Sequence, residues 1–231
     1  MKRFWNATSV LPEGAGFAIR LDSHPLKLPS GRPLSVPFKA LAEAIAAEWA
    51  MVGADFTPDD LPLTRLATTA QERISLHRAE IVAQLAAYGM NDLLCYRAEG
   101  PPGLTQREAE AWDPWIGWLD QKLGIRLETT AGIMPLQQAP EYRDIFTTHL
   151  MCMDEYQLAG LGVIIPALGS LVLALAVEAG ALAPDAACRC ASLGELWQET
   201  LWGMDAQAAG RRRIIAEDVA VSARFMVLCR T

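Results

Sequence analysis

The sequence has little histidine, a side chain on which many catalytic and metal sites depend. Among its 231 residues there are three histidines, His24, His77 and His149, and none belongs to an HExxH motif or to a pair with metal-ligand spacing. The chain also lacks a GxSxG motif, a serine-lysine signature and the glycine-rich P-loop that binds phosphates. We therefore expect a protein that is not an enzyme and that uses no cofactor and no metal.

The cysteines are too scattered for a disulfide framework. There are five, so they cannot all pair within the chain, and this usage favours a reducing compartment. Two of them are separated by a single arginine, but no second CxxC motif and no nearby histidine pair completes four ligands for zinc. The sequence therefore argues against both a disulfide scaffold and a zinc site at Cys95, Cys152, Cys188, Cys190 and Cys229.

Basic residues are outnumbered, with 20 lysines and arginines against 27 aspartates and glutamates, and the net charge is −7. Nucleic-acid binding requires a basic face, and the one basic run, residues 211–213, is too short to supply it. The N-terminal segment MKRFWNATSV is basic, but no apolar signal segment and no Arg- and Ser-rich transit segment follows. We expect a cytoplasmic protein without a nucleic-acid partner.

Long uncharged runs are also scarce. The longest, residues 156–177, could span a bilayer. Its flanks are acidic, no lysine or arginine sets an orientation, and glycine, proline and serine interrupt it between residues 160 and 170. We predict two buried helices and no stable membrane insertion, with a single membrane-spanning helix as the alternative.

Hydrophobic residues make up 52% of the chain and charged residues 20%, a composition typical of a folded globular protein. Short β-favouring runs in the first part of the chain alternate with turn clusters, which predicts a small antiparallel sheet over about residues 4–36. A helix is expected from the proline at position 37 to Gly53. The fold class is therefore α+β, beginning with a β-rich domain, residues 1–55, that ends in a helix.

Residues 56–231 are expected to form a larger, all-helical domain, because apolar side chains recur there at helical spacing. The segment IRLETTAGIM, residues 125–134, is the exception. It predicts an isolated strand that could join the N-terminal sheet. The helices are predicted at about residues 63–74, 76–88, 105–123, 141–151, 154–164, 169–179, 184–202 and 205–229.

The stretch ELWQETLWG, residues 195–203, carries two tryptophans five positions apart. In a helix, Trp197 shares a face with the leucines, whereas Trp202 points toward the side of Glu195 and Gln198. Two interpretations of this second tryptophan are open. Either another helix of the chain covers it, or it helps to dock another protein, since tryptophan is enriched at interface hot spots.

Five segments in order are similar to one protein family: PLTRLATTAQERI (62–74), DLLCYRAEGP (92–101), AWDPWIGWL (111–119), GSLVLALAVEAG (169–180) and ELWQETLWGMD (195–205). The chain resembles the Atp12 family, assembly chaperones of the F1 part of ATP synthase. The resemblance implies a β-rich N-terminal portion, a helical C-terminal portion and a soluble protein. It also implies binding of the unassembled F1 α subunit, which the family protects from aggregation before the β subunit arrives, without ATP hydrolysis or bound nucleotide.

The resemblance also implies a set of partner-binding residues. In the family, the segment matching residues 195–205 is linked with chaperone function, and a second sensitive position matches the tryptophan of AEWA, residues 47–50. An acidic residue usually stands three positions before the tryptophan of the Trp-Gln pair; here that position is Gly194, and the acidic Glu195 follows it. The expected set is Glu195, Trp197, Gln198, Trp202, Gly203, Asp205 and Trp49.

Two alternatives accompany this set. Trp49 continues the apolar face of its own helix, so it is equally well interpreted as a core side chain. For the whole protein, the alternative function is a small, metal-independent hydrolase or transferase with an unrecognised site. The absence of a transit segment favours a bacterial, cytoplasmic member of the family.

Overall fold

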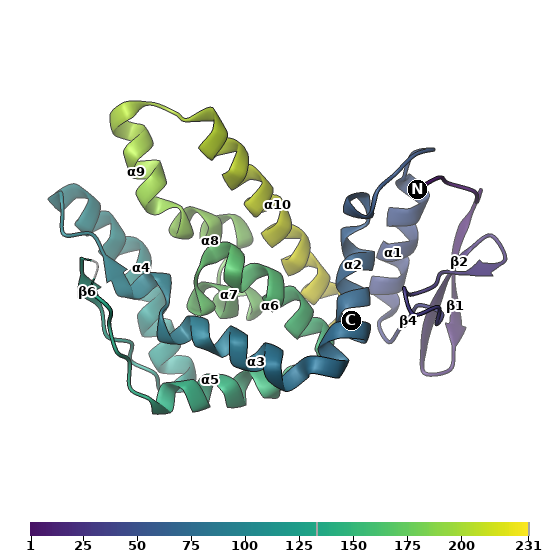
Figure 1. Cartoon of the computed structure of the whole chain (residues 1–231), viewed down its shortest axis with the longest axis horizontal. Helices are drawn as coiled ribbons and strands as arrows, with labels where there is room; N and C mark the ends of the chain where they lie inside the picture. The colour runs from purple at the N-terminus through teal and green to yellow at the C-terminus, as the bar shows by residue number, and fades with distance from the viewer. Residues whose placement is uncertain (133, 231) are drawn as a thin grey trace. The chain divides into compact units, whose positions relative to one another are not determined.

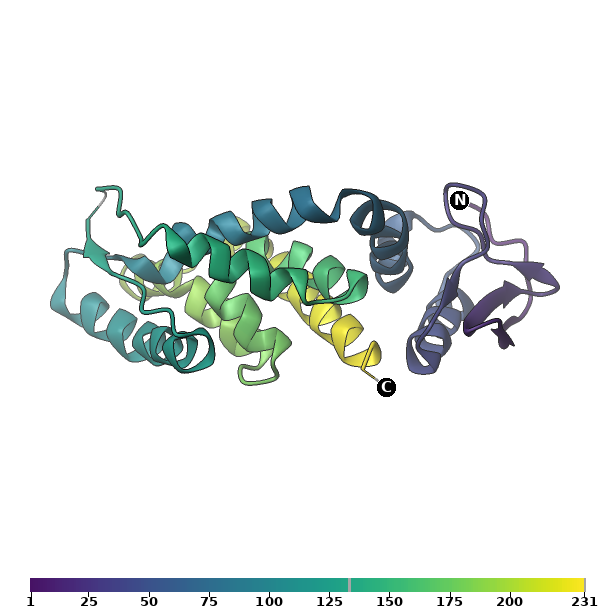
Figure 2. The same ribbon diagram turned by 90° about the horizontal axis from the view of Figure 1, so that it is seen from below.

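The computed structural model describes residues 1–132 and 134–230 (Figures 1 and 2). The chain forms two compact units, each built from separate stretches of sequence. Unit 1 comprises residues 1–78, 154–160 and the C-terminal segment from 221; unit 2 comprises residues 79–153 and 161–220. The predicted fold class is confirmed, with a small antiparallel sheet at the N-terminus followed by a helical region. The boundary predicted at residue 55 lies inside unit 1.

The sheet of unit 1 is built around its second strand. β2 (Gly16–Leu21) pairs antiparallel with β1 (Thr8–Glu13), with β3 (His24–Pro25) and with β4 (Ser35–Val36). The turn between β1 and β2 contains Gly14 at a φ of +59°, a conformation that glycine adopts without steric cost. The four strands lie within the predicted range of residues 4–36.

One helix, α1 (Lys39–Met51), packs on this sheet (Figures 1 and 2). Its apolar residues recur at helical spacing, so Leu41 and Ile45 lie on one face and are fully buried. The buried face is therefore what holds the helix to the sheet, and the predicted helix from residue 37 to Gly53 is confirmed.

The next helical stretch is more continuous than predicted. After a 3₁₀ turn at Pro58–Asp60, α2 (Pro62–Thr68) runs through a π-helical turn at Thr69–Ile74 into α3 (Ser75–Met90). The predicted break near residue 75 is instead a kink at His77, which has φ −125° and ψ 27°. A π turn and one distorted residue therefore change the helix direction without a loop.

Unit 1 is completed by distant parts of the sequence. The Tyr156 ring from the first turn of α6 (Glu155–Leu168) stacks on the Phe225 ring from the end of α10 (Ala206–Leu228), with 6.1 Å between centroids. The Tyr156 hydroxyl also accepts a hydrogen bond from Gln71 at 2.9 Å. Unit 1 is therefore not contiguous in sequence, unlike the domain predicted for residues 1–55.

Most of unit 2 is helical. Two short helices stand where one was predicted at 184–202, because the backbone leaves helical geometry at Ser192. Residue 231, inside the predicted helical domain, lies outside the described residues. Apart from the parts of α3, α6 and α10 that belong to it, unit 2 contains α4 (Pro102–Leu123), α5 (Glu141–Met151), α7 (Leu171–Glu178), α8 (Pro184–Ala191) and α9 (Leu193–Trp202).

The strand predicted at residues 125–134 does not join the N-terminal sheet, so that expectation is wrong. The strand is short, β6 (Thr130–Ala131), and it pairs in parallel with β5 (Tyr96–Arg97) in unit 2. The Gln138 side chain exchanges two hydrogen bonds with the Glu128 backbone, at 3.0 and 2.9 Å, and this holds the segment in place. Residue 133 of the predicted strand lies outside the described residues.

The uncharged run forms parts of two helices, α6 and α7, as predicted. Every residue of α7 from Leu171 to Val177 is buried. The helix begins at Ser170, whose hydroxyl accepts a hydrogen bond from the Leu173 amide at 3.0 Å. Within the described residues, no helix is both long and apolar enough to cross a membrane.

A short 3₁₀ helix, Leu93–Cys95, precedes β5 and is connected to the start of α7 by a buried carboxylate. One oxygen of Asp92 accepts hydrogen bonds from the Ser170 hydroxyl at 2.7 Å and the Leu94 amide at 3.0 Å. The other oxygen accepts from the Val172 amide at 3.0 Å. Asp92 therefore caps both helices from inside the core of unit 2.

Candidate functional site

The helix α9, which contains most of the predicted partner-binding residues, is unusually exposed. None of its residues is buried. It ends at Gly203, which has a φ of +87°, and the Gly203 amide donates to the carbonyl of Glu199 at 3.0 Å. Glycine at this position allows the chain to leave the helix sharply. A loop follows, and α10 then begins beside α9 (Figure 1).

The end of α9 presents large apolar side chains to solvent. Trp202 is 78% exposed, and its neighbours Leu201 and Met204 are 56% and 74% exposed. No helix of the described chain covers Trp202, so the interpretation of this residue as a side chain buried by another helix is wrong. A cluster of exposed apolar side chains around a tryptophan is typical of a protein–protein interaction site.

The loop between the two helices is held by Asp205. Its carboxylate accepts hydrogen bonds from the amides of Ala208 at 3.2 Å and Gln207 at 2.8 Å, which makes it the N-terminal cap of α10. These two backbone hydrogen bonds hold the pKa of Asp205 below its usual value. The predicted role of this residue in binding therefore coexists with a structural role in the turn.

Ion pairs from one arginine connect α9 and α10. Arg212 donates to Glu195 at 2.8 Å and also to Glu199. The Arg212 side chain is 15% exposed, so the pair with Glu199 is better shielded from solvent than a typical surface pair. These hydrogen bonds raise the pKa of Arg212 above its usual value. Glu195, which follows Gly194 in the sequence, therefore already has a cationic partner within the chain.

Between the two helices lies a cleft of about 500 Å³, which we call the α9–α10 cleft. It combines the exposed tryptophan and methionine with carboxylates and arginines. Five of the seven predicted residues meet there. The cleft is lined by Glu195, Gln198, Glu199, Trp202, Gly203, Met204, Asp205, Ala208, Arg211 and Arg212.

Comparison with known proteins identifies the family. Residues 2–120 match the sequence profile described as ATP12 chaperone protein, which is more than half of the chain. The chain belongs to the ATP12 chaperone family. The crystal structure of Atp12 from Paracoccus denitrificans has a TM-score of 0.95 and 35% identity, over 99% of this chain and 98% of that one.

Two further relatives of this ATP12 family member extend the comparison. The mitochondrial protein atp12 of Schizosaccharomyces pombe is 27% identical over 214 residues, which are 87% of this chain and 74% of that protein. The crystal structure of an Agrobacterium tumefaciens protein has a TM-score of 0.92 and 31% identity, over 100% of this chain and 86% of that one. The structural similarity therefore includes α9 and α10, which lie beyond the residues matched by the family profile.

Trp197, the sixth predicted residue, lies on the other side of α9 and is half-buried. Its ring packs against α4, where a Cβ atom on Gly103 would come within 2.9 Å of Cη2 of the indole. The guanidinium of Arg107 lies over the same ring, 4.7 Å from its centroid. Trp197 therefore belongs to the contact between α4 and α9 rather than to the lining of the α9–α10 cleft.

Trp49, the seventh, lies in unit 1 and is only 9% exposed. Its ring packs against Trp5 and Phe56, at centroid distances of 5.0 and 5.7 Å, and its indole N–H donates to the Thr64 hydroxyl at 2.9 Å. This geometry matches the core interpretation of the residue. In the ATP12 family member described here, Trp49 is packed among the aromatic side chains of unit 1, and its part in partner binding stays a prediction.

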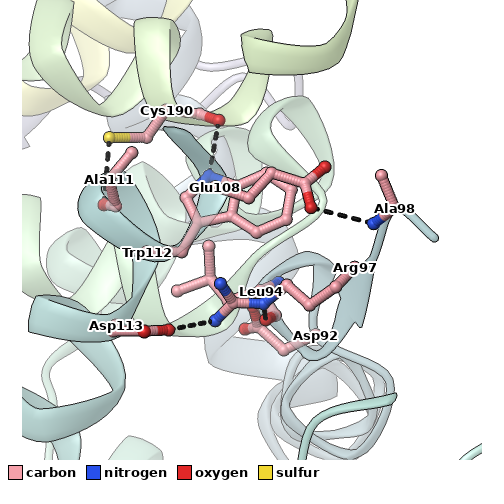
Figure 3. Close-up of polar contacts among 9 residues, drawn as sticks. All are labelled: Asp92, Leu94, Arg97, Ala98, Glu108, Ala111, Trp112, Asp113 and Cys190. Atoms are coloured by element: carbon pink, nitrogen blue, oxygen red, sulfur yellow. Dashed lines mark hydrogen bonds and ion pairs between the residues drawn. The ribbon is translucent and has the colours of Figure 1, made fainter. Parts of the chain in front are cut away.

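The sequence did not single out the polar contacts that position the helices next to α9 (Figure 3). The Trp112 indole of α4 donates to the Cys190 carbonyl of α8 at 2.9 Å, close to the point where α8 ends. The Arg97 guanidinium lies 5.1 Å from the centroid of the Trp112 ring and pairs with Asp113 at 2.7 Å. Trp112 lies in the segment AWDPWIGWL, but its hydrogen-bond partner Cys190 is 78 residues away in sequence.

Asp205 and Arg212 are the residues of the α9–α10 cleft whose pKa is shifted in the described chain, and hydrogen bonds within the turn and between the two helices cause both shifts. Burial raises the pKa of Asp92 to about 6 and that of Cys95 to about 12, and neither residue lines the cleft. Hydrogen bonds occupy both oxygens of Asp92. In the described part of the chain, no three His, Cys, Asp or Glu side chains are grouped so that they could hold a metal ion.

Proposed function

We propose that this protein is an assembly chaperone that binds the unassembled F1 ATP synthase α subunit and prevents its aggregation until the F1 complex forms. Membership of the ATP12 chaperone family supports the general role. The observation that carries the proposed binding site is Trp202, an exposed tryptophan at the edge of a cleft formed by two helices of unit 2.

The physical basis is the exposure of apolar surface on both partners. A subunit that has not yet joined its complex exposes surface intended for its neighbours, and that surface promotes aggregation. The exposed side chains of Leu201, Trp202 and Met204 offer a complementary apolar area, and the surrounding carboxylates and arginines keep it hydrated when no client is bound. A patch of this kind can be covered by a client without large changes in the chaperone.

The binding cycle that we propose requires no catalysis and no nucleotide. A neighbouring subunit with a larger interface on the client can displace the chaperone by competition. Within the α9–α10 cleft, the carboxylates of Glu195 and Glu199 are paired with Arg212, an arrangement suited to holding two helices rather than to transferring protons. We propose that the cleft residues Gln198 and Trp202 contact the client directly.

The test compares Trp202→Ala with a matched exposed aromatic in unit 1. Phe4 is 70% exposed, so Phe4→Ala removes a similar exposed ring far along the sequence. Purified α subunit is titrated with each chaperone variant, and its aggregation is followed by light scattering. We expect Trp202→Ala to weaken binding by about 1–3 kcal/mol, as interface aromatics do, and to leave the free energy of unfolding nearly unchanged.

The Phe4→Ala variant should protect the α subunit as well as the wild-type protein does. If the wild-type protein neither binds the α subunit nor suppresses its aggregation, the proposed function is wrong. If Trp202→Ala protects as well as wild type, the function stands but the α9–α10 cleft is not its binding site.

A further inference from the structure

A second cleft lies on the opposite side of α9, where the helix faces α4 and α8 in unit 2. Its volume is about 450 Å³, within the range of roughly 300–1,000 Å³ that is common for ligand pockets. The floor is apolar and the rim carries two arginines and one glutamate. The lining comprises Arg107, Glu110, Ala111, Ala186, Arg189, Cys190, Leu193, Leu196 and Trp197.

The position of one arginine is set by the way that helix α4 meets α9. Gly103 and Arg107 are four residues apart, so they lie one turn apart on the same face of α4. The absence of a side chain at Gly103 lets the Trp197 ring lie close to the helix, and the Arg107 guanidinium lies over that ring. The ring thus restrains the guanidinium at the rim of the cleft.

Arg107 has donors that the chain does not use. Among the residues that the structure describes, the Arg107 side chain makes no hydrogen bond and no ion pair; its one described interaction is the contact with the Trp197 ring. The other rim arginine, Arg189, is paired with Asp185 at 2.6 Å, and both of these side chains are largely exposed. Glu110 accepts a hydrogen bond from Gln106 at 2.8 Å and forms no ion pair with Arg107.

We propose that this second cleft binds a segment of the client protein in which an aspartate or glutamate stands next to a large apolar side chain. The apolar side chain would lie on the floor formed by Leu193, Leu196 and the Trp197 ring. The carboxylate would pair with the fork of donors on Arg107, whose planar geometry matches two carboxylate oxygens. The proposal rests on the proposed function, because it assumes a protein client, and it assigns a second contact surface to the same helix.

Charge favours this occupant over a basic one. Arg189 is already paired with Asp185, and Glu110 is the one carboxylate of the lining, so the charge left without a partner is the guanidinium of Arg107. A lysine or arginine of a partner would be repelled at this position, whereas a carboxylate gains a charge-assisted hydrogen bond. The two sides of α9 would then recognise different chemistry, with exposed apolar side chains at one and a carboxylate at the other.

The experiment measures the affinity of the full-length protein for purified α subunit at about 50 and 200 mM salt, since screening separates charge contacts from apolar ones. Arg107→Gln should weaken binding about tenfold and reduce its salt dependence, because a charge-assisted hydrogen bond is lost. Arg107→Lys keeps the charge but lacks the fork of donors, so its affinity should lie between that of the wild-type protein and that of Arg107→Gln. The control is Arg143→Gln, which removes the charge of an exposed arginine on α5 and should change affinity by less than about twofold.

A second variant changes the position of the arginine without changing charge. Gly103→Ala places a methyl group against the Trp197 ring, so the ring and the guanidinium above it must shift. This variant should weaken binding toward the level of Arg107→Gln. Because the added methyl group crowds the ring and can lower stability, the affinity is compared per folded molecule.

Peptides that cover the α-subunit sequence test the carboxylate. Those that lose binding to Arg107→Gln should contain Asp or Glu beside a large apolar residue.

If the wild-type protein does not bind the α subunit, the proposed function fails. If it binds and Arg107→Gln binds within about twofold of it, only the second contact is overturned. The second contact is also overturned if the affected peptides lack acidic residues. The same holds if Arg107→Gln abolishes self-association of this protein but leaves client affinity intact, because a second copy would then be the occupant.

Discussion

Asp92 is fully buried, and two opposing effects act on the pKa of its carboxyl group. Burial in the core disfavours the charged form and raises the pKa, whereas hydrogen bonds from the Val172 and Leu94 amides and the Ser170 hydroxyl favour the charged form and lower it. Burial is the larger effect, and the pKa rises from 3.8 to about 6. Asp92 should therefore make the stability of the fold depend on pH.

The direction follows from linkage between ionisation and folding. Since the folded-state pKa is above the unfolded value, the folded protein holds the proton more tightly, and this stabilisation is fully present only below the unfolded pKa of 3.8. It is lost as the pH rises through about 6. A shift of about 2 units corresponds to a loss on the order of 3 kcal/mol, at about 1.4 kcal/mol per unit.

The assay isolates this residue by comparing the wild-type protein with Asp92→Asn. Urea denaturation of both proteins at several pH values between about 4 and 7 gives the free energy of unfolding at each pH. Other titrating groups contribute equally to both proteins, so they cancel in the difference. The wild-type value minus the Asp92→Asn value should fall by about 2–3 kcal/mol between about pH 4 and pH 7.

The sign of the change in this difference with pH shows which of the two effects on the pKa of Asp92, burial or hydrogen bonding, is larger. If the difference in the free energy of unfolding rises with pH, the three hydrogen bonds outweigh burial and the pKa is lowered rather than raised. A difference that does not change with pH would show that folding leaves the pKa of Asp92 unaltered. Either result would refute this account of the core of unit 2.

Three further predictions concern the core, the aromatic cluster and nucleotide. Leu173→Asp introduces a charge at a fully buried position of α7, so it should lower the free energy of unfolding by more than about 4 kcal/mol in urea denaturation. Wild-type stability of this variant would contradict the position of α7 in the core. Trp49→Phe removes the hydrogen bond to Thr64 and leaves a cavity beside Trp5 and Phe56, so it should cost more than about 1 kcal/mol of stability. Affinity for the α subunit per folded molecule should stay unchanged, and a specific loss of affinity would support Trp49 as a binding residue. Millimolar ATP should not raise the melting temperature, since the sequence has no phosphate-binding loop, and a saturable rise would require a nucleotide site.

The parts of the fold that the sequence predicts well are those determined by local patterns. Turn residues at short intervals identify the strands of the N-terminal sheet, and apolar spacing identifies α1 and the two helices of the uncharged run. The strand at Thr130–Ala131 was assigned to the wrong sheet because its partner, β5, is two residues long and carries no recognisable pattern. The break at Ser192 was missed because both neighbouring helices have ordinary helical sequences.

For the candidate site, the sequence predicts which residues share a helix face but does not predict whether those residues are exposed. Helical geometry predicts that Trp202 lies on the side of Glu195 and Gln198, and all three line the α9–α10 cleft. Spacing along one helix cannot tell whether another helix covers that side, so the exposure of Trp202 required the tertiary structure. Arg212 and Arg107 were not predicted at all, because each meets its partner on α9 only through the packing of a different helix.

The discontinuity of unit 1 has a consequence for the order in which the protein folds during its synthesis. The sheet, α1 and α2 leave the ribosome before Tyr156 and Phe225, which stack within the same unit but stand about two-thirds of the way along this sequence and in the last turns of α10. The first unit to emerge is therefore among the last to be completed. Until the final turns of α10 have left the exit tunnel, this chaperone carries an unfinished core of its own and is itself a protein that can aggregate.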